Sequence, residues 1–138
     1  MKICIIISNF YPEISNNLLK GAINVLNKNK KIKYKVFHTD GTFEIPFLMS
    51  RLVKKFDSFI VLGCVIKGKT PHFDFLCKSV FDSLLNISIL YKKPLGNGIL
   101  TCLNKNQAFE RSDPKKVNKG GAAAKAMISV FKTLKDEK

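Results

Sequence analysis

The sequence predicts an α/β protein in which helices cover both faces of a four-stranded parallel sheet, a three-layer α/β/α sandwich. Two observations support this prediction. Strand-like apolar segments alternate along the chain with segments of helical periodicity, the pattern of parallel sheets with right-handed crossovers. Residues 2–8 and 58–66 are apolar almost throughout, as strands covered on both faces are. The 138 residues contain no linker, repeat or low-complexity tract, so we expect a single domain, 1–138.

The first half of the chain gives two strands and two helices. After the strand KICIIIS (2–8), apolar residues recur at 18, 19, 22, 23, 25 and 26, which predicts a helix over 15–28 with a Ser/Asn cap. The alternating segment 32–39 is a predicted strand. A helix is expected over 45–56, with Pro46 near its start and Leu48, Leu52 and Phe56 on one face.

The second half repeats the alternation. SFIVLGCVI (58–66) is a predicted buried strand, and residues 70–91 form a long predicted helix. The segment 94–102 is a strand that we expect to be interrupted by Gly96 and Gly98. A short helix over 106–112 and a final helix over 120–135 complete the chain.

The carboxyl ends of the four predicted strands are expected to carry the functional site. In open parallel sheets, binding residues gather in the loops at this edge. The four loops in question are SNFYPE (8–13), TDGTFEIP (39–46), VIKGKTPH (65–72) and the region after GILTC (98–102).

One of these loops fits a nucleotide-phosphate motif. GCVIKGKT (63–70) matches G-x-x-x-x-G-K-[ST]. Three features argue against a nucleoside triphosphatase: Cys-Val-Ile at the variable positions is strand-like, Pro71 removes an N–H at the helix mouth, and no apolar strand ends in an aspartate for Mg²⁺.

The same loop offers a better candidate for chemistry in His72. Thr70 is a suitable N-cap and Pro71 a suitable first helical residue, which would place His72 in the first turn. The helix N-terminus disfavours the imidazolium there, and a neutral imidazole can accept and return a proton. A surface histidine at a helix cap is the alternative. His38, in an alternating strand, is interpreted as structural.

Other candidates come from the remaining loops. Arg111 is one of two arginines in a lysine-rich chain, which indicates bidentate binding of a phosphate or carboxylate, although a helix-surface arginine is an equal alternative. Glu44 could accept hydrogen bonds from hydroxyls or serve as a charge at a helix start. Phe10 and Tyr11 could stack on a planar ring, although loop aromatics usually pack against the protein.

Composition limits the remaining possibilities. Cys4, Cys64, Cys77 and Cys102 form no C-x-x-C pair and lie in apolar segments, so we expect buried reduced thiols and a cytoplasmic protein without a metal. No apolar run reaches the roughly 18–20 residues needed to span a bilayer, and the first segment is read as a strand rather than a signal peptide. No association with a membrane is therefore expected.

The formal net charge is +14. The lysines are scattered over nearly every segment and the chain has no nucleic-acid-binding motif, so nucleic-acid binding is not expected as the main function. A lysine-rich coat could instead draw in anionic small molecules.

Several segments together resemble the 6,7-dimethyl-8-ribityllumazine synthase family. They are SNFYPEISNNLLKGA, GTFEIP, LGCVIKGKTPHFDFLC, NGILT, QAFERSD and NKGGAAAKA, in the family's order and spacing over almost the whole chain. The resemblance implies a flavodoxin-like fold. It also implies condensation of 5-amino-6-(D-ribitylamino)uracil with 3,4-dihydroxy-2-butanone 4-phosphate to give the lumazine, phosphate and water, without cofactor or metal. A non-catalytic flavin- or lumazine-binding protein of the same fold is the alternative.

The resemblance assigns roles to individual residues. Phe10 corresponds to the aromatic that stacks on the pyrimidine, and His72 to the proton-transfer histidine. The other implied contacts are Thr42, Phe43 and Glu44 to the ribityl chain; Cys64, Val65 and Ile66 to the uracil edge; Lys69, Thr70 and Arg111 to the butanone phosphate; and Lys119 near the site.

Asn97 is a departure from the family's pattern. Many members have an aromatic at this position, which lies over the pyrimidine from the neighbouring subunit; asparagine cannot stack in the same way but can hydrogen-bond a ring edge. The resemblance further implies a homo-oligomer, a pentamer or a multiple of it, with sites shared between subunits, and it allows association with riboflavin synthase.

Overall fold

A computed structural model describes residues 1–137 of the chain. Its four parallel strands form one sheet in the order β2-β1-β3-β4. They are β1 (Lys2–Ser8), β2 (Lys33–Thr39), β3 (Ser58–Ile66) and β4 (Leu95–Cys102). β1 and β3 are the central strands and have neighbours on both sides, which explains why their sequences are apolar almost throughout.

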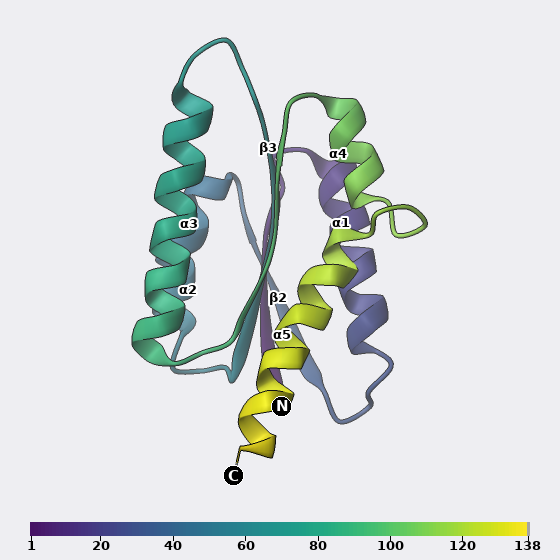
Figure 1. Cartoon of the computed structure of the whole chain (residues 1–138), viewed down its shortest axis with the longest axis vertical. Coiled ribbons are helices and arrows are strands. Elements are labelled where there is room, and N and C mark those ends of the chain that lie inside the picture. Colours follow the sequence, from purple (N-terminus) through teal and green to yellow (C-terminus); the bar gives the residue numbers. More distant parts are fainter. Residues whose placement is uncertain (138) are drawn as a thin grey trace.

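Helices cover both faces of this sheet (Figure 1). On one side lie α1 (Pro12–Leu26), α4 (Lys105–Ser112) and α5 (Lys119–Asp136); on the other lie the short 3₁₀ helix η1 (Thr42–Glu44), α2 (Ile45–Leu52) and α3 (His72–Tyr91). The predicted three-layer α/β/α sandwich of flavodoxin-like type is confirmed. No helix within residues 1–137 combines the length and apolarity required to traverse a bilayer.

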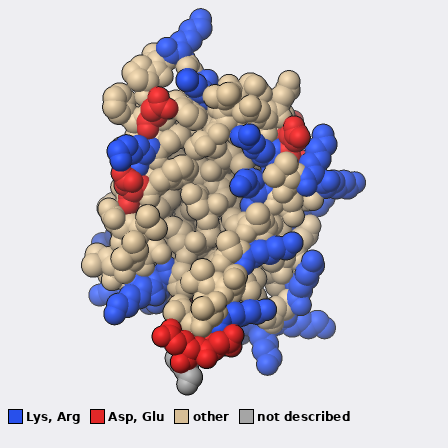
Figure 2. All heavy atoms as spheres, in the orientation of Figure 1, with Lys and Arg blue, Asp and Glu red and all other residues tan. Residues whose placement is uncertain are grey.

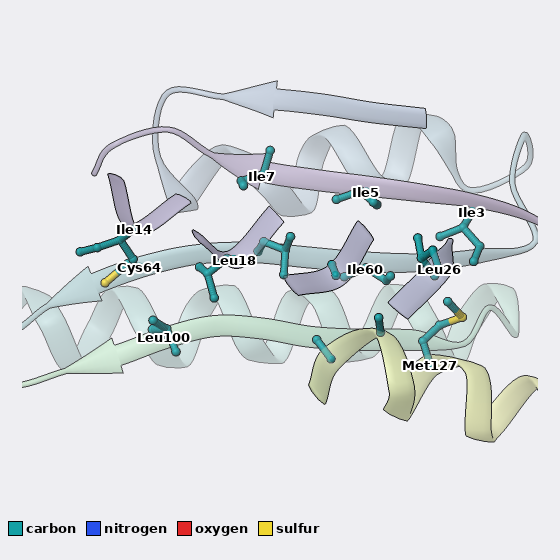
Figure 3. Packing of buried hydrophobic residues seen from close by; sticks show 14 of the residues in the cluster. Ile3, Ile5, Ile7, Ile14, Leu18, Leu26, Ile60, Cys64, Leu100 and Met127 are labelled. Atoms are coloured by element: carbon teal, nitrogen blue, oxygen red, sulfur yellow. The ribbon is translucent and has the colours of Figure 1, made fainter. Parts of the chain in front are cut away.

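The core forms two layers because side chains alternate along each strand. Ile3, Ile5 and Ile7 of β1 pack with Leu18 of α1 and Met127 of α5 (Figure 3). On the other face, Cys4 and Ile6 pack with the buried side chains of α2 and α3. The sheet is therefore held rigidly between the two helical layers, and its strand ends provide fixed supports for the loops.

The start of α1 differs from the predicted one. The helix begins at Pro12, three residues before the expected Ser/Asn cap, with Tyr11 at the cap position and no side-chain cap. Proline is favourable at this position because its fixed φ suits the first turn. Ser15 is buried inside the helix, and its hydroxyl donates to the carbonyl oxygen of Ser8 at 2.5 Å. The first loop is therefore shorter than predicted.

Two further predictions, the end of one helix and the interruption of one strand, were also wrong. α2 ends at Leu52 rather than at Phe56, although Phe56 remains in the core. β4 runs without interruption through Gly96 and Gly98. A Cβ atom at Gly96 would collide with the carbonyl oxygen of Ala123 in α5. This glycine therefore permits close packing of a helix on the strand rather than breaking the strand.

Candidate active site

A cavity of about 540 Å³ lies at the edge of the sheet where the strands end. The loop after β1, the loop and 3₁₀ helix after β2, the end of β3 and the start of α3 form its walls. The cavity brings together the following predicted residues: Phe10, Thr42, Phe43, Glu44, Cys64, Val65, Ile66 and His72. The cavity lies at the predicted edge of the sheet and is lined from the segments after β1, β2 and β3, whereas no described residue from the fourth predicted region, after β4, lines it.

Two aromatic side chains are exposed at the cavity. Phe10 and Phe43 are each 67% exposed although they are large and apolar. Phe10 is held by an edge-to-face contact with Tyr11, with ring centroids 4.9 Å apart and an interplanar angle of 77°. The ring is thus oriented by a neighbour while it stays accessible to a planar ligand.

The backbone turn after β2 positions Glu44. Its Oε1 accepts a hydrogen bond from the N–H of Gly41 at 2.9 Å, and this contact caps η1. Thr42, in the same turn, is buried against the cavity wall. Glu44 therefore caps the start of η1, one of the two roles expected from the sequence, and it also lines the cavity.

The cysteines are not suited to act as nucleophiles. Burial, and to a smaller extent the adjacent Cys102 thiol, raises the pKa of Cys64 to about 12. Burial likewise raises the pKa of Cys4 to about 12 and raises that of Cys77. Cys4, Cys64 and Cys102 are buried and Cys77 is half-buried, and all four are free thiols. A neutral Cys64 thiol is a weak nucleophile and forms an apolar part of the cavity wall.

His72 is the first residue of α3 and is exposed at the cavity. Pro71 occupies the cap position, so the helix begins one residue later than predicted. The Thr70 hydroxyl nevertheless accepts from the His72 N–H at 3.4 Å, the contact expected of a capping threonine. This loop places the imidazole ring of His72 in the cavity, next to the carboxyl end of β3.

Comparison with known proteins points to one family over nearly the whole chain. The family model described as 6,7-dimethyl-8-ribityllumazine synthase matches residues 1–135. The chain belongs to the lumazine synthase family. It is 40% identical over 141 aligned positions to the 6,7-dimethyl-8-ribityllumazine synthase of Buchnera aphidicola subsp. Schizaphis graminum (strain Sg), covering 96% of this chain and 89% of that protein. It is 34% identical to the protein of that name from Limosilactobacillus reuteri (strain DSM 20016), with coverages of 94% and 87%.

Some residues to which the lumazine synthase resemblance assigns roles lie outside the cavity of the single chain. Lys69 and Thr70 are exposed in the loop just before His72. Arg111 is half-buried in the last turn of α4, and its Nη1 lies 3.9 Å from the sulfur of Cys102. Because the Cys102 thiol interacts with that of Cys64 in the cavity wall, Arg111 is separated from the cavity by two side chains.

Asn97 and Lys119 are more remote from the cavity. Asn97 is exposed in the middle of the edge strand β4, where its Oδ1 accepts from the N–H of Ile99 at 3.0 Å. Lys119 is exposed at the first turn of α5. Neither side chain contributes to the cavity of its own chain.

Two cavity residues were missing from the candidates named from the sequence: Gly41 and Leu76. Leu76 lies one helical turn after His72, so the i, i+4 spacing could have identified it. Tyr11, named with Phe10 as a possible stacking aromatic, also lines the cavity. Burial raises the pKa of Tyr11, with a second contribution from Cys64.

Proposed function

We propose that this chain condenses 5-amino-6-(D-ribitylamino)uracil with 3,4-dihydroxy-2-butanone 4-phosphate to give 6,7-dimethyl-8-ribityllumazine, phosphate and water. The observation that carries the proposal is the cavity itself, in which residues from four separate segments of the chain converge. The family to which the chain belongs consists of enzymes, and the relatives named above carry the name of this activity.

The pyrimidine is assigned to the apolar half of the cavity. The exposed face of Phe10 offers a stacking surface, and the backbone of Val65 and Ile66 at the end of β3 offers hydrogen-bonding groups for the uracil edge. Thr42, Phe43 and Glu44 face the cavity from the opposite loop, where the free carboxylate oxygen of Glu44 can accept from ribityl hydroxyls. Asn97 is assigned to the cavity of a neighbouring subunit.

His72 is assigned to proton transfer. Formation of the Schiff base, elimination of phosphate and closure of the second ring each move a proton between nitrogen, carbon and oxygen. A histidine at the mouth of the cavity can accept and return these protons in turn, a contribution of about 10²–10⁴ in rate. The rest of the acceleration is assigned to holding the two substrates together.

Lys69, Thr70 and Arg111 are assigned to the butanone phosphate, and Lys119 to a position near it. Lys69 and Thr70 lie in the open loop that leads into His72; no atom lies within 4 Å of a Cβ placed on the neighbouring Gly68. This loop has the space to approach a ligand. A guanidinium on the phosphate both anchors the substrate and stabilises the leaving charge.

We further propose that the chain assembles into a pentamer or a multiple of it, works in the cytoplasm without a cofactor, and can associate with riboflavin synthase. The support for assembly is the exposure of large apolar side chains, which is greatest on the layer of α2 and α3, while Phe109, Val130 and Leu134 of the other layer are exposed to a smaller extent. Large apolar residues of α2 and α3 are exposed: Phe47, Phe75, Leu85, Ile89 and Leu90. Exposed apolar patches of this kind mark protein interfaces.

The decisive experiment is a turnover assay. The purified protein is mixed with both substrates, and lumazine absorbance is followed against the spontaneous reaction. We expect a rate that is proportional to protein concentration. Binding of lumazine without turnover at several pH values would contradict the enzyme proposal and identify a binding protein of the same fold.

A further inference from the structure

A second concave surface lies far from the cavity, between the turn after α1 and the outer side of α5. It consists of two adjoining hollows of about 470 and 510 Å³ that share Val25, Ile128 and Lys132. Because they share a wall, the two hollows form one continuous groove, which we call the lysine groove. It lies near the amino end of β2, at the opposite end of the sheet from the cavity.

The lysine groove is strongly basic. Its lining includes five lysines: Lys28, Lys30, Lys31, Lys125 and Lys132. Asp136, at one end, is the single acidic residue in the lining. Lys125 and Lys132 are seven residues apart on α5, so they lie on one helix face about 10 Å from each other. Figure 2 shows basic side chains crowding the side of the molecule that α1 and α5 occupy.

The floor of the lysine groove is apolar. Val25, Ile32 and Ile128 line it, and all three are half-buried and packed against the core between the sheet and the two helices. The floor is therefore fixed in shape. Asn29, Ser129 and Thr133 add neutral polar groups between the lysines. Arginines and aromatic residues are absent from this lining.

We propose that the lysine groove binds a single-stranded nucleic acid without sequence preference. Lysines are point charges that contact phosphates without the bidentate geometry that reads a base edge. The half-buried aliphatic floor offers apolar contact, without aromatic stacking, to the unstacked bases of a single strand, whereas a duplex keeps its bases inside. An inorganic polyphosphate matches the charge of the groove but makes no use of its apolar floor.

The assignment is compatible with the proposed enzyme. The lysine groove lies on the helical layer opposite the exposed apolar residues of α2 and α3, so the proposed assembly through those residues leaves it open. None of its lysines lines the cavity. Binding here is therefore expected to be independent of lumazine formation.

The test measures the fluorescence anisotropy of a labelled 20-nucleotide oligouridylate over a range of salt concentrations. The logarithm of the binding constant should fall linearly with the logarithm of the salt concentration. Each lysine–phosphate contact on a single strand contributes about −0.7 to the slope, so the five lysines predict a slope no steeper than about −3.5. The variant Lys31→Gln/Lys125→Gln/Lys132→Gln is expected to bring the slope to about −1.4 and to weaken binding at least about tenfold at low salt.

The matched control removes the same charge elsewhere. Lys54, Lys55 and Lys116 are exposed and lie outside the lysine groove, and their replacement by glutamine should weaken binding less than about threefold. Equal losses in both triple variants would overturn the proposal, because overall charge would then explain binding. So would equal affinity for a duplex, or for inorganic polyphosphate with the same number of phosphates.

Lumazine formation is measured in parallel for the wild type and the two triple variants. Both triple variants are expected to keep the wild-type rate. A wild-type protein that fails the turnover assay but binds the oligouridylate would contradict only the enzyme proposal. A protein that turns over and shows no salt-dependent binding would contradict only the lysine groove.

Discussion

Arg111 places Nη1 3.9 Å from the sulfur of Cys102, the last residue of β4. This contact connects α4 to the strand end, and through the neighbouring Cys64 to the wall of the cavity. The guanidinium itself lies outside the cavity of the single chain. The proposed contact of Arg111 with the phosphate therefore requires a ligand that extends out of the cavity.

Replacement of Arg111 by alanine should raise the KM for butanone phosphate far more than the KM for the pyrimidine. Loss of charge-assisted hydrogen bonds worth about 1.5–3 kcal/mol corresponds to a decrease of roughly 10–150-fold in kcat/KM for the phosphate substrate. Steady-state kinetics, with each substrate varied in turn, measure the change in KM for each of the two substrates. Arg51→Ala, at the chain's other arginine on α2, is the matched control and should change neither KM. Equal losses for both substrates would reject the assigned role of Arg111.

Replacement of His72 by glutamine should lower kcat by about 10²–10⁴ and leave pyrimidine affinity within a few-fold of wild type, since only the proton transfers are lost. His38→Gln is the control, because it removes the other histidine, which contacts Asn9 at 3.0 Å rather than the cavity. A wild-type kcat in His72→Gln would remove this residue from the mechanism.

Cys64 should make folding stability depend on alkaline pH. Its pKa is raised from its ordinary value of 9.0 to about 12 in the folded chain, so the folded state holds this proton more tightly than the unfolded state. The resulting stabilisation is complete below pH 9 and is lost as pH rises towards 12. Between pH 8 and 10 the loss is about 1.4 kcal/mol for this thiol. In urea unfolding, the free energy of unfolding should decrease less between pH 8 and 10 in Cys64→Ala than in wild type. Identical decreases in the two proteins would refute the prediction.

Gly96→Ala should destabilise the fold by about 1–3 kcal/mol, because the added methyl group meets the backbone of Ala123 and forces α5 away from β4. Gly68→Ala is the paired control, since a Cβ there has no atom within 4 Å and should change the free energy of unfolding by less than about 0.5 kcal/mol. Urea unfolding of both variants measures the difference. An unaffected Gly96→Ala protein would show that the helix and the strand are not in close contact.

Ile89→Asp should dissociate the proposed assembly. Ile89 is 65% exposed on α3 among the other apolar residues of that layer, and an unpaired carboxylate in an apolar interface is costly to bury. Native mass spectrometry should change from a multiple of five chains to smaller species. Val130→Asp, at a partly exposed apolar position on α5, is the control and should keep the wild-type mass. A monomeric wild-type protein would contradict the assembly itself.

The regular pattern of the sequence was enough to predict the layers of the fold. Buried central strands such as 58–66 are apolar throughout because both faces are covered, and this depends on the local segment alone. Glycines were harder to interpret, since Gly96 has the same local signature whether it breaks a strand or admits a helix. The start of α1 was misplaced for a similar reason, because Ser15 resembles a cap until the carbonyl of Ser8 is seen to accept its hydroxyl.

The sequence by itself determined the succession of strands and helices along the chain, the edge of the sheet that carries the site, and most residues of the cavity. Each of these depends on strand ends and loop motifs that are continuous segments of the chain. Only the tertiary structure decided which remote side chains meet. It showed Arg111 next to Cys102, Leu76 in the cavity, and lysines that look scattered in the sequence gathered along one groove between α1 and α5. These relations depend on the packing of helices onto the sheet, which brings together residues that are up to about a hundred positions apart and leaves no local signal in either segment.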